Sequence, residues 1–324
     1  MAIDFTTTRE GSYAGDFYPK GWDYRRIKRI TGLGIDEFDK PQPHWHRGFR
    51  PIVCDDSSSG GGGVETMNAM MGYEIFDQVR QAAARRKPLA LILPVGPMGM
   101  YRWAVYFSQK HNVSWKHVHG FNMDEWSDAK GNTSPPSAPG SFQGAMEEAL
   151  YGPLGTLTVP RSQRNFATRR LLPKYPEKIA ALKKKGAKLV VVYGIGRACH
   201  IAFWEPHFAE EYRSESAWKA DPYRLGARLH PLTIEQNSLH SFASRLTLIP
   251  LYANTIGPGL FTKADYCIGG ADGAHGPLNW QGQSLWMTLR YGPDRWVPSS
   301  FMPTRPGRLF VIKAVAGPLK AEAH

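Results

Sequence analysis

The stretch KLVVVYGIGRACHIAFWEP, residues 188–206, joins an apolar segment to a loop that is rich in reactive side chains. After the initial lysine the segment is continuously apolar and rich in valine, which is typical of a strand buried on both faces of a parallel sheet. The loop that follows carries Arg197, His200 and Glu205. The sequence therefore predicts a central strand with reactive side chains at its carboxyl end.

Similar strands recur along the chain, separated by helical patterns. Leu89 to Leu93 is an apolar run ended by Pro94, and residues 116–121 form a second short candidate. Helical spacing of apolar residues predicts helices over 67–86, 99–110, 142–151 and 175–186. The later part of the chain offers further strand candidates over 246–251, 264–269 and 309–314. This alternation predicts an α/β fold, a doubly wound and mostly parallel sheet with helices on both faces.

The chain divides near residue 66. We predict an N-terminal extension over residues 1–66, which ends in a flexible Gly/Ser-rich loop from Asp55 to Gly63, and one α/β domain over 67–324. The extension has four aromatic residues: Phe17, Tyr18, Trp22 and Tyr24. They could form a subunit contact, cover the active site or pack on their own domain.

Composition narrows the class of protein. Among 324 residues, 40 Lys and Arg outnumber 28 Asp and Glu, which gives a net charge of +12. The basic residues are scattered and match no nucleic-acid-binding motif. No apolar run reaches the roughly 18–20 residues of a membrane helix. The absence of a signal-peptide pattern and the three cysteines favour a cytoplasmic protein. His44 and His46 have no third ligand at a suitable spacing, so we predict no metal site.

Ligands of such sheets bind outside the carboxyl ends of the strands. That position holds Gly96, Pro97 and Met98 after the first strand, Asp124 and Glu125 after the second, and the His200 loop after the third. Carboxylates and an imidazole that converge on one edge suit proton transfer.

Structural explanations stand beside this one. Asp124 and Glu125 could stabilise a helix N-terminus, His200 could be a satisfied core histidine, and Glu205 before Pro206 could be a loop acid. Gly194 and Gly196 could begin a dinucleotide-binding fingerprint, but its third glycine would be Cys199, so we predict no nicotinamide cofactor.

Five motifs, in order along the chain, resemble the glucosamine-6-phosphate deaminase/isomerase family, whose wider group includes the 6-phosphogluconolactonases. The most specific are FNMDE at 121–125 and GIGRACHIAFWEP at 194–206. The others are LPVGPM at 93–98, RLHPLT at 228–233 and TIGPG at 255–259. The resemblance spans roughly residues 67–315.

The resemblance implies a mechanism that needs no metal or organic cofactor. Asp124 matches the aspartate that moves a proton between C2 and C1 of a sugar, and His200 and Glu205 match the pair that helps to open its ring. The same resemblance implies that Arg228 is a phosphate ligand. Because family members often assemble as oligomers, a homo-oligomer is expected.

The chain departs from the family at three places. Ala198 stands where the family has a ring-opening aspartate, the loop at 93–98 is shorter than the family's phosphate loop, and Asp272 lies in the segment where the family has a phosphate-binding lysine. Arg197 could fork onto an anionic group, and Trp204 could present a flat face to a sugar, or both could merely fill space.

We therefore expect a sugar isomerase or deaminase with catalytic Asp124, His200 and Glu205. Its expected substrate differs from glucosamine-6-phosphate and is either an unphosphorylated sugar or one with an acidic group elsewhere. The expected substrate-binding residues are Gly96, Pro97, Met98, Glu125, Arg197, Trp204 and Arg228. The alternatives are a non-catalytic sugar-binding or regulatory protein and a sugar-lactone hydrolase.

Overall fold

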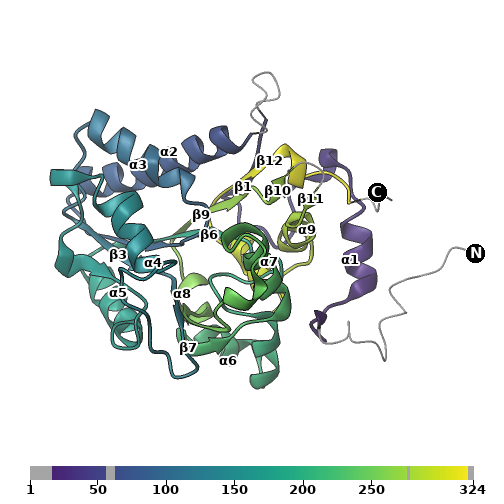
Figure 1. Ribbon diagram of the computed structural model, residues 1–324. Coiled ribbons are helices and arrows are strands. Elements are labelled where there is room, and N and C mark those ends of the chain that lie inside the picture. The colour runs from purple at the N-terminus through teal and green to yellow at the C-terminus, as the bar shows by residue number, and fades with distance from the viewer. Residues whose placement is uncertain (1–16, 56–62, 276–277, 320–324) are drawn as a thin grey trace, which may run out of the picture.

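The computed structural model describes residues 17–55, 63–275 and 278–319, and its centre is a seven-stranded sheet (Figure 1). The strand order is β1-β12-β9-β6-β2-β3-β5, and every pairing is parallel. The strands are β1 (Phe49–Cys54), β12 (Gly307–Ile312), β9 (Tyr266–Ala271), β6 (Lys188–Gly194), β2 (Leu89–Leu93), β3 (Val118–Asn122) and β5 (Arg164–Asn165). The predicted α/β fold with a parallel sheet is confirmed.

Helices cover both faces of this sheet. In Figure 1, α2 and α3 lie above it and α5 lies below it. The helices are α1 (Tyr24–Ile30), α2 (Val64–Ala84), α3 (Gly99–Lys110), α4 (Phe142–Met146), α5 (Tyr175–Lys184), α6 (Glu215–Ala220), α7 (Pro231–Ser241), α8 (Pro258–Phe261) and α9 (Gly282–Arg290). None of the helices in the described ranges is long and apolar enough to cross a membrane.

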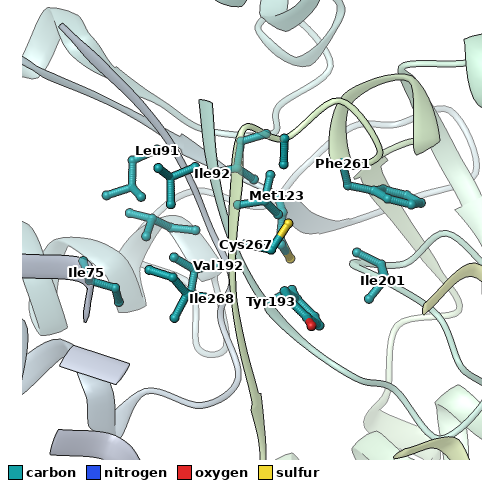
Figure 2. Close-up of a cluster of buried hydrophobic side chains, with 14 of the residues drawn as sticks. Ile75, Leu91, Ile92, Met123, Val192, Tyr193, Ile201, Phe261, Cys267 and Ile268 are labelled. Carbon is teal, nitrogen blue, oxygen red and sulfur yellow. The ribbon is translucent and has the colours of Figure 1, made fainter. Parts of the chain in front are cut away.

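The central strands are apolar because they are covered on both sides. Leu89–Leu93 is buried at every position, and only the two ends of β6 are partly exposed. Figure 2 shows how α2, β2, β6 and β9 supply one shared cluster, to which Ile75, Leu91, Val192 and Ile268 belong. A Cβ on Gly72 of α2 would lie 2.6 Å from the Met100 carbonyl oxygen, so this glycine permits the close packing of α2 on α3.

A second, antiparallel sheet stands beside the carboxyl edge of the first. Its order is β4 (Asp124–Ser127), β8 (Tyr252–Ile256) and β7 (Tyr223–Arg228), and β4 begins two residues after β3 ends. The strand predicted at 246–251 is wrong. Leu246–Leu248 is a 3₁₀ turn whose leucines are exposed, and the strand begins at Tyr252, after Pro250.

The N-terminal segment contributes to the folded unit. Residues 49–54, which the sequence places in the extension, form the edge strand β1 and pair with β12 along its whole length. Trp22 packs with Met287 and Tyr291, and its indole N–H donates to the Trp296 carbonyl at 2.7 Å. Of the three roles considered for the aromatic residues, Trp22 packs on its own domain. The Gly/Ser-rich tract at 56–62 lies outside the described residues.

Candidate active site

A cavity of about 1000 Å³ opens at the carboxyl edge of the central sheet. Segments that follow β2, β3, β6 and β9 line it, together with the start of α4, with α7 and its following turn, and with residues near Trp280. The cavity thus lies where parallel-sheet topology places ligand sites. Asp124, His200 and the loop Gly96–Met98, which the sequence predicts to meet at this edge, all line it.

Asp124 is a buried carboxyl group at the start of β4. Its residue is 5% exposed, and its Oδ1 accepts no hydrogen bond from any residue that the structure describes. Burial, and then the nearby Glu125 carboxylate, raise the pKa of Asp124 well above its ordinary value. A carboxylate kept from hydrogen-bond donors and made more basic is suited to accept a proton from a weak carbon acid.

Glu125 has a different place although it is the next residue. Successive side chains of a strand point to opposite faces, and Glu125 accepts hydrogen bonds from the backbone N–H groups of Phe142 (2.9 Å), Gln143 (2.8 Å) and Trp126 (3.1 Å). Burial raises its pKa, and these donors oppose the rise. The helix-terminal explanation therefore holds for Glu125, which caps α4 and does not line the cavity.

His200 sits on the tight loop that follows β6. Cys199 and Ala202, on either side of it, have φ of 61° and 55°, a left-handed conformation that residues with a side chain rarely adopt. Backbone bonds hold the loop: the Cys199 N–H donates to the Gly196 carbonyl at 2.8 Å, and the Ser299 N–H donates to the Cys199 carbonyl at 2.9 Å. A Cβ on Gly196 would overlap the His200 imidazole, so the glycine leaves room for the ring.

Glu205 lies behind His200, away from the cavity. Its carboxylate is fully buried, and Oε2 is 3.3 Å from His200 Nδ1. Burial alone would raise the pKa of Glu205, but His200, followed by His230 and His207, holds that pKa below its ordinary value. The Thr233 hydroxyl, on α7, lies between the two side chains.

Three further residues predicted to bind substrate lie outside the cavity, as Glu125 does. Arg197 forms an ion pair with Glu235. Trp204 is fully buried and its ring packs against Phe208, so protein covers the face that could have met a sugar. Arg228 is exposed on β7. Their linear proximity to His200 or α7 did not bring them into the site, because the loop and strand turn these side chains elsewhere.

The far wall of the cavity consists of residues that were not predicted as ligands. It includes Gln236, His240, Arg245, Asp272 and Trp280. The His240 and Trp280 rings lie 5.5 Å apart, and burial raises the pKa of Asp272. Asp272 follows the strand predicted at 264–269, in the segment where the resemblance implies a ligand. The other four residues give no local signal in the sequence that they share this wall.

The charge of the lining is opposite to that of the chain. The described lining contains three carboxyl groups, on Asp124, Glu148 and Asp272, and one guanidinium group, on the exposed Arg245. The whole chain has a net charge of +12. Among the described residues, no group of three or more His, Cys, Asp and Glu side chains gathers to hold a metal ion.

Sequence comparison finds curated enzymes. The chain is 29% identical over 189 residues to the glucosamine-6-phosphate deaminase of Pectobacterium carotovorum subsp. carotovorum, and 28% identical over 189 residues to that of Yersinia pestis. Each match covers 55% of this chain and 62% of the relative, so the similarity extends over less than two thirds of those enzymes. No protein-family profile matches the chain.

Solved structures share the fold over most of the chain. A monomeric glucosamine-6-phosphate deaminase superposes with a TM-score of 0.64 at 16% identity, covering 83% of this chain and 98% of that one. The 6-phosphogluconolactonase of Trypanosoma cruzi superposes with a TM-score of 0.55 at 16% identity, covering 85% and 98%. The chain is thus similar in sequence to glucosamine-6-phosphate deaminases over part of their length, and it shares its fold with solved glucosamine-6-phosphate deaminase and 6-phosphogluconolactonase structures.

Proposed function

We propose that the protein converts an aldose into a ketose and releases ammonia when C2 of the sugar carries an amine. Asp124 takes the proton from C2 of the open-chain sugar, leaving an enediol or enolamine, and returns it to C1. An amine on C2 thereby becomes an imine, which water hydrolyses to a ketone and ammonia. His200, supported by Glu205, opens the ring by taking the proton of the C1 hydroxyl and delivering it to the ring oxygen.

The environment of Asp124 carries this proposal. It is a buried carboxyl group that lines the cavity, has an unpartnered oxygen among the described residues, and has a raised pKa. Leaving such a group unsatisfied costs folding free energy, which favours a functional role over a structural one. Its neighbour Glu125, fully engaged at the end of α4, shows what a structural carboxylate looks like at the same place.

The substrate that we propose is a neutral or cationic sugar without a phosphate group. Three carboxyl groups against one exposed guanidinium disfavour a phosphate dianion in this cavity. Arg197 and Arg228, the arginines first considered for an anionic group, lie outside the lining. The Gly96–Met98 loop contains no side-chain donor and one proline, which has no N–H. An amino sugar with a free ammonium group fits these charges best.

Proton NMR in D₂O tests the proposal. The purified protein is incubated separately with glucosamine, glucosamine-6-phosphate, glucose-6-phosphate and glucosaminic acid, and the C2 proton signal is followed. We expect the glucosamine signal to disappear faster than that of glucosamine-6-phosphate, with a ketose and ammonia appearing. Unchanged C2 signals for all these sugars would contradict the proposal and favour a sugar-binding protein without turnover.

A lactone hydrolase is the second candidate, because His200 lines the same cavity and could direct water at a carbonyl. The structural similarity to 6-phosphogluconolactonases is of the fold. Hydrolysis of a sugar lactone would release an acid without exchange at C2. The same samples therefore separate the two reactions when gluconolactone, with and without phosphate, is added to the set.

A further inference from the structure

A chain of hydrogen bonds runs from the protein backbone to the imidazole of His200. The His230 N–H donates to Glu205 Oε1 at 3.2 Å, the Thr233 hydroxyl donates to Glu205 Oε2 at 3.0 Å, and Thr233 Oγ1 lies 2.9 Å from His200 Nδ1. Glu205 and Thr233 are both fully buried. Water therefore does not compete for these groups, and each hydrogen atom in the chain has a defined place.

The chemistry of the hydroxyl fixes the direction of the chain. A threonine hydroxyl has one hydrogen to donate, and an ionised carboxylate can only accept. Since that hydrogen goes to Glu205, the oxygen of Thr233 presents a lone pair to His200 Nδ1. The other polar neighbour of Nδ1, Glu205 Oε2 at 3.3 Å, is also an acceptor. Nδ1 must therefore carry a hydrogen.

We infer that Thr233 is a positioning residue that holds His200 in the tautomer with its hydrogen on Nδ1 and a lone pair on Nε2. His200 lines the cavity, and its Nδ1 is engaged by Thr233 and Glu205, which are buried behind it, so Nε2 is the ring nitrogen left to meet a sugar. This inference rests on the proposed function, in which His200 takes the proton of the C1 hydroxyl. Ala198 has no polar side chain, so Thr233 and Glu205 are the groups that orient Nδ1.

Other titratable groups near Glu205 do not disturb this arrangement. His207 and His230 lie with their rings 5.7 Å apart, and burial lowers the pKa of both, that of His230 to about 4. His230 is therefore neutral at neutral pH, and the neutral form of His207 is favoured. His230 Nδ1 accepts the Leu232 N–H at 3.2 Å, so His230 carries its hydrogen on Nε2, the opposite tautomer to that inferred for His200.

Glu205→Gln reverses the chain without changing its shape. The amide oxygen of the glutamine takes the Oε1 position, because the His230 N–H needs an acceptor there. The NH₂ group therefore takes the Oε2 position and faces Thr233. The amide then donates to the hydroxyl, the hydroxyl donates to His200 Nδ1, and the hydrogen of His200 moves to Nε2. The lone pair is lost from the cavity side. A comparable exchange in a serine protease triad lowers kcat about 10⁴-fold through the wrong tautomer.

The experiment measures the tautomer directly in the full chain labelled with ¹⁵N-histidine. Long-range ¹H–¹⁵N spectra at about pH 8, above the ordinary range of histidine titration, distinguish protonated from unprotonated ring nitrogens. A His200→Asn variant assigns the signal of His200 among the 11 histidines. His230 is the internal reference for the opposite tautomer.

We expect His200 to carry its hydrogen on Nδ1 in the unmodified protein and in Thr233→Ser, and on Nε2 in Glu205→Gln. Thr233→Val, which has the same shape without the hydroxyl, should move the Nδ1–H resonance and lower kcat about tenfold with little change in KM, consistent with the loss of one orienting hydrogen bond. Thr233→Ser should retain most of kcat.

Two results would overturn the inference: His200 protonated on Nε2 in the unmodified protein, or a tautomer that does not change in Glu205→Gln. Neither depends on turnover. Failure of the proposed reaction would show as an unchanged C2 proton signal, so the two failures are distinguishable.

Discussion

The two walls of the cavity are built from different kinds of position. The first wall follows the ends of β2, β3 and β6 and holds Asp124 and His200. The second wall consists of residues on α7, on its following turn and in the segments 272–275 and 280–281, and it holds His240 and Trp280. Strand ends are fixed by the register of the sheet, whereas side chains on a helix or turn can change without altering the fold. The residues that carry out the reaction can thus be kept on the first wall while the residues that recognise the substrate change on the second.

The largest effect is expected on the first wall. Asp124→Asn removes the proposed base and should lower kcat by about 10²-fold to 10⁴-fold, which is the range of general acid–base catalysis. C2 proton exchange measures the loss. Retention of exchange within a factor of three would remove Asp124 from the mechanism.

The same substitution should stabilise the fold in a pH-dependent way. Because the folded-state pKa of Asp124 is raised above its ordinary value of 3.8, the folded protein retains a proton that the unfolded chain has released. The stabilising contribution of that proton is complete below the ordinary pKa and is lost as pH rises through the raised pKa. The Tm advantage of Asp124→Asn should therefore be near zero at about pH 4 and larger at about pH 7.

Glu125→Gln is the matched control one residue away. Burial raises the pKa of Glu125 too, but its hydrogen-bond donors oppose that rise, so the change in stability should have the opposite sign. An amide cannot accept from three backbone N–H groups as the carboxylate does, so the free energy of unfolding should fall by about 1–3 kcal/mol. Urea denaturation of both variants at neutral pH makes the comparison. A stabilised Glu125→Gln would show that the bonds to α4 do not hold its N-terminus.

On the second wall the expected effect is smaller and concerns recognition. Asp272→Asn removes a half-buried carboxyl group from the cavity and should tighten binding of glucosamine-6-phosphate roughly threefold to tenfold, with less change for glucosamine. Isothermal titration calorimetry measures both affinities. Glu148→Gln, which removes an exposed carboxyl group from the same cavity, should change them less because solvent screens it. Equal changes in affinity for the two variants would show that selectivity against phosphate comes from the net charge of the whole cavity and not from Asp272.

The smallest effect is expected outside both walls. Arg197→Ala breaks a partly exposed ion pair with Glu235 and should change the free energy of unfolding by less than about 1 kcal/mol, and KM by less than about twofold. Steady-state kinetics on the substrate found by NMR tests this. A tenfold rise in KM would show that Arg197 contributes to substrate binding.

Local sequence patterns predict the first wall and, apart from Asp272, not the second. The strand patterns of β3 and β6 and the polar residues after them locate Asp124 and His200, because topology alone brings the ends of parallel strands together on either side of β2. The directions of the Trp204 and Arg228 side chains depend on how a loop and an edge strand turn. The register of the second sheet cannot be predicted from the local sequence. The leucines at 246–248 resemble a strand but lie in an exposed turn.

The left-handed residues that flank His200 also affect the entropy of the site. A glycine at Cys199 or Ala202 would adopt the observed φ more easily, but it would also let the loop sample many other conformations. Side chains at both positions narrow that range, so the loop loses most of its freedom when the protein folds. The imidazole is then already ordered before a sugar arrives, and little conformational entropy remains to be lost in each turnover.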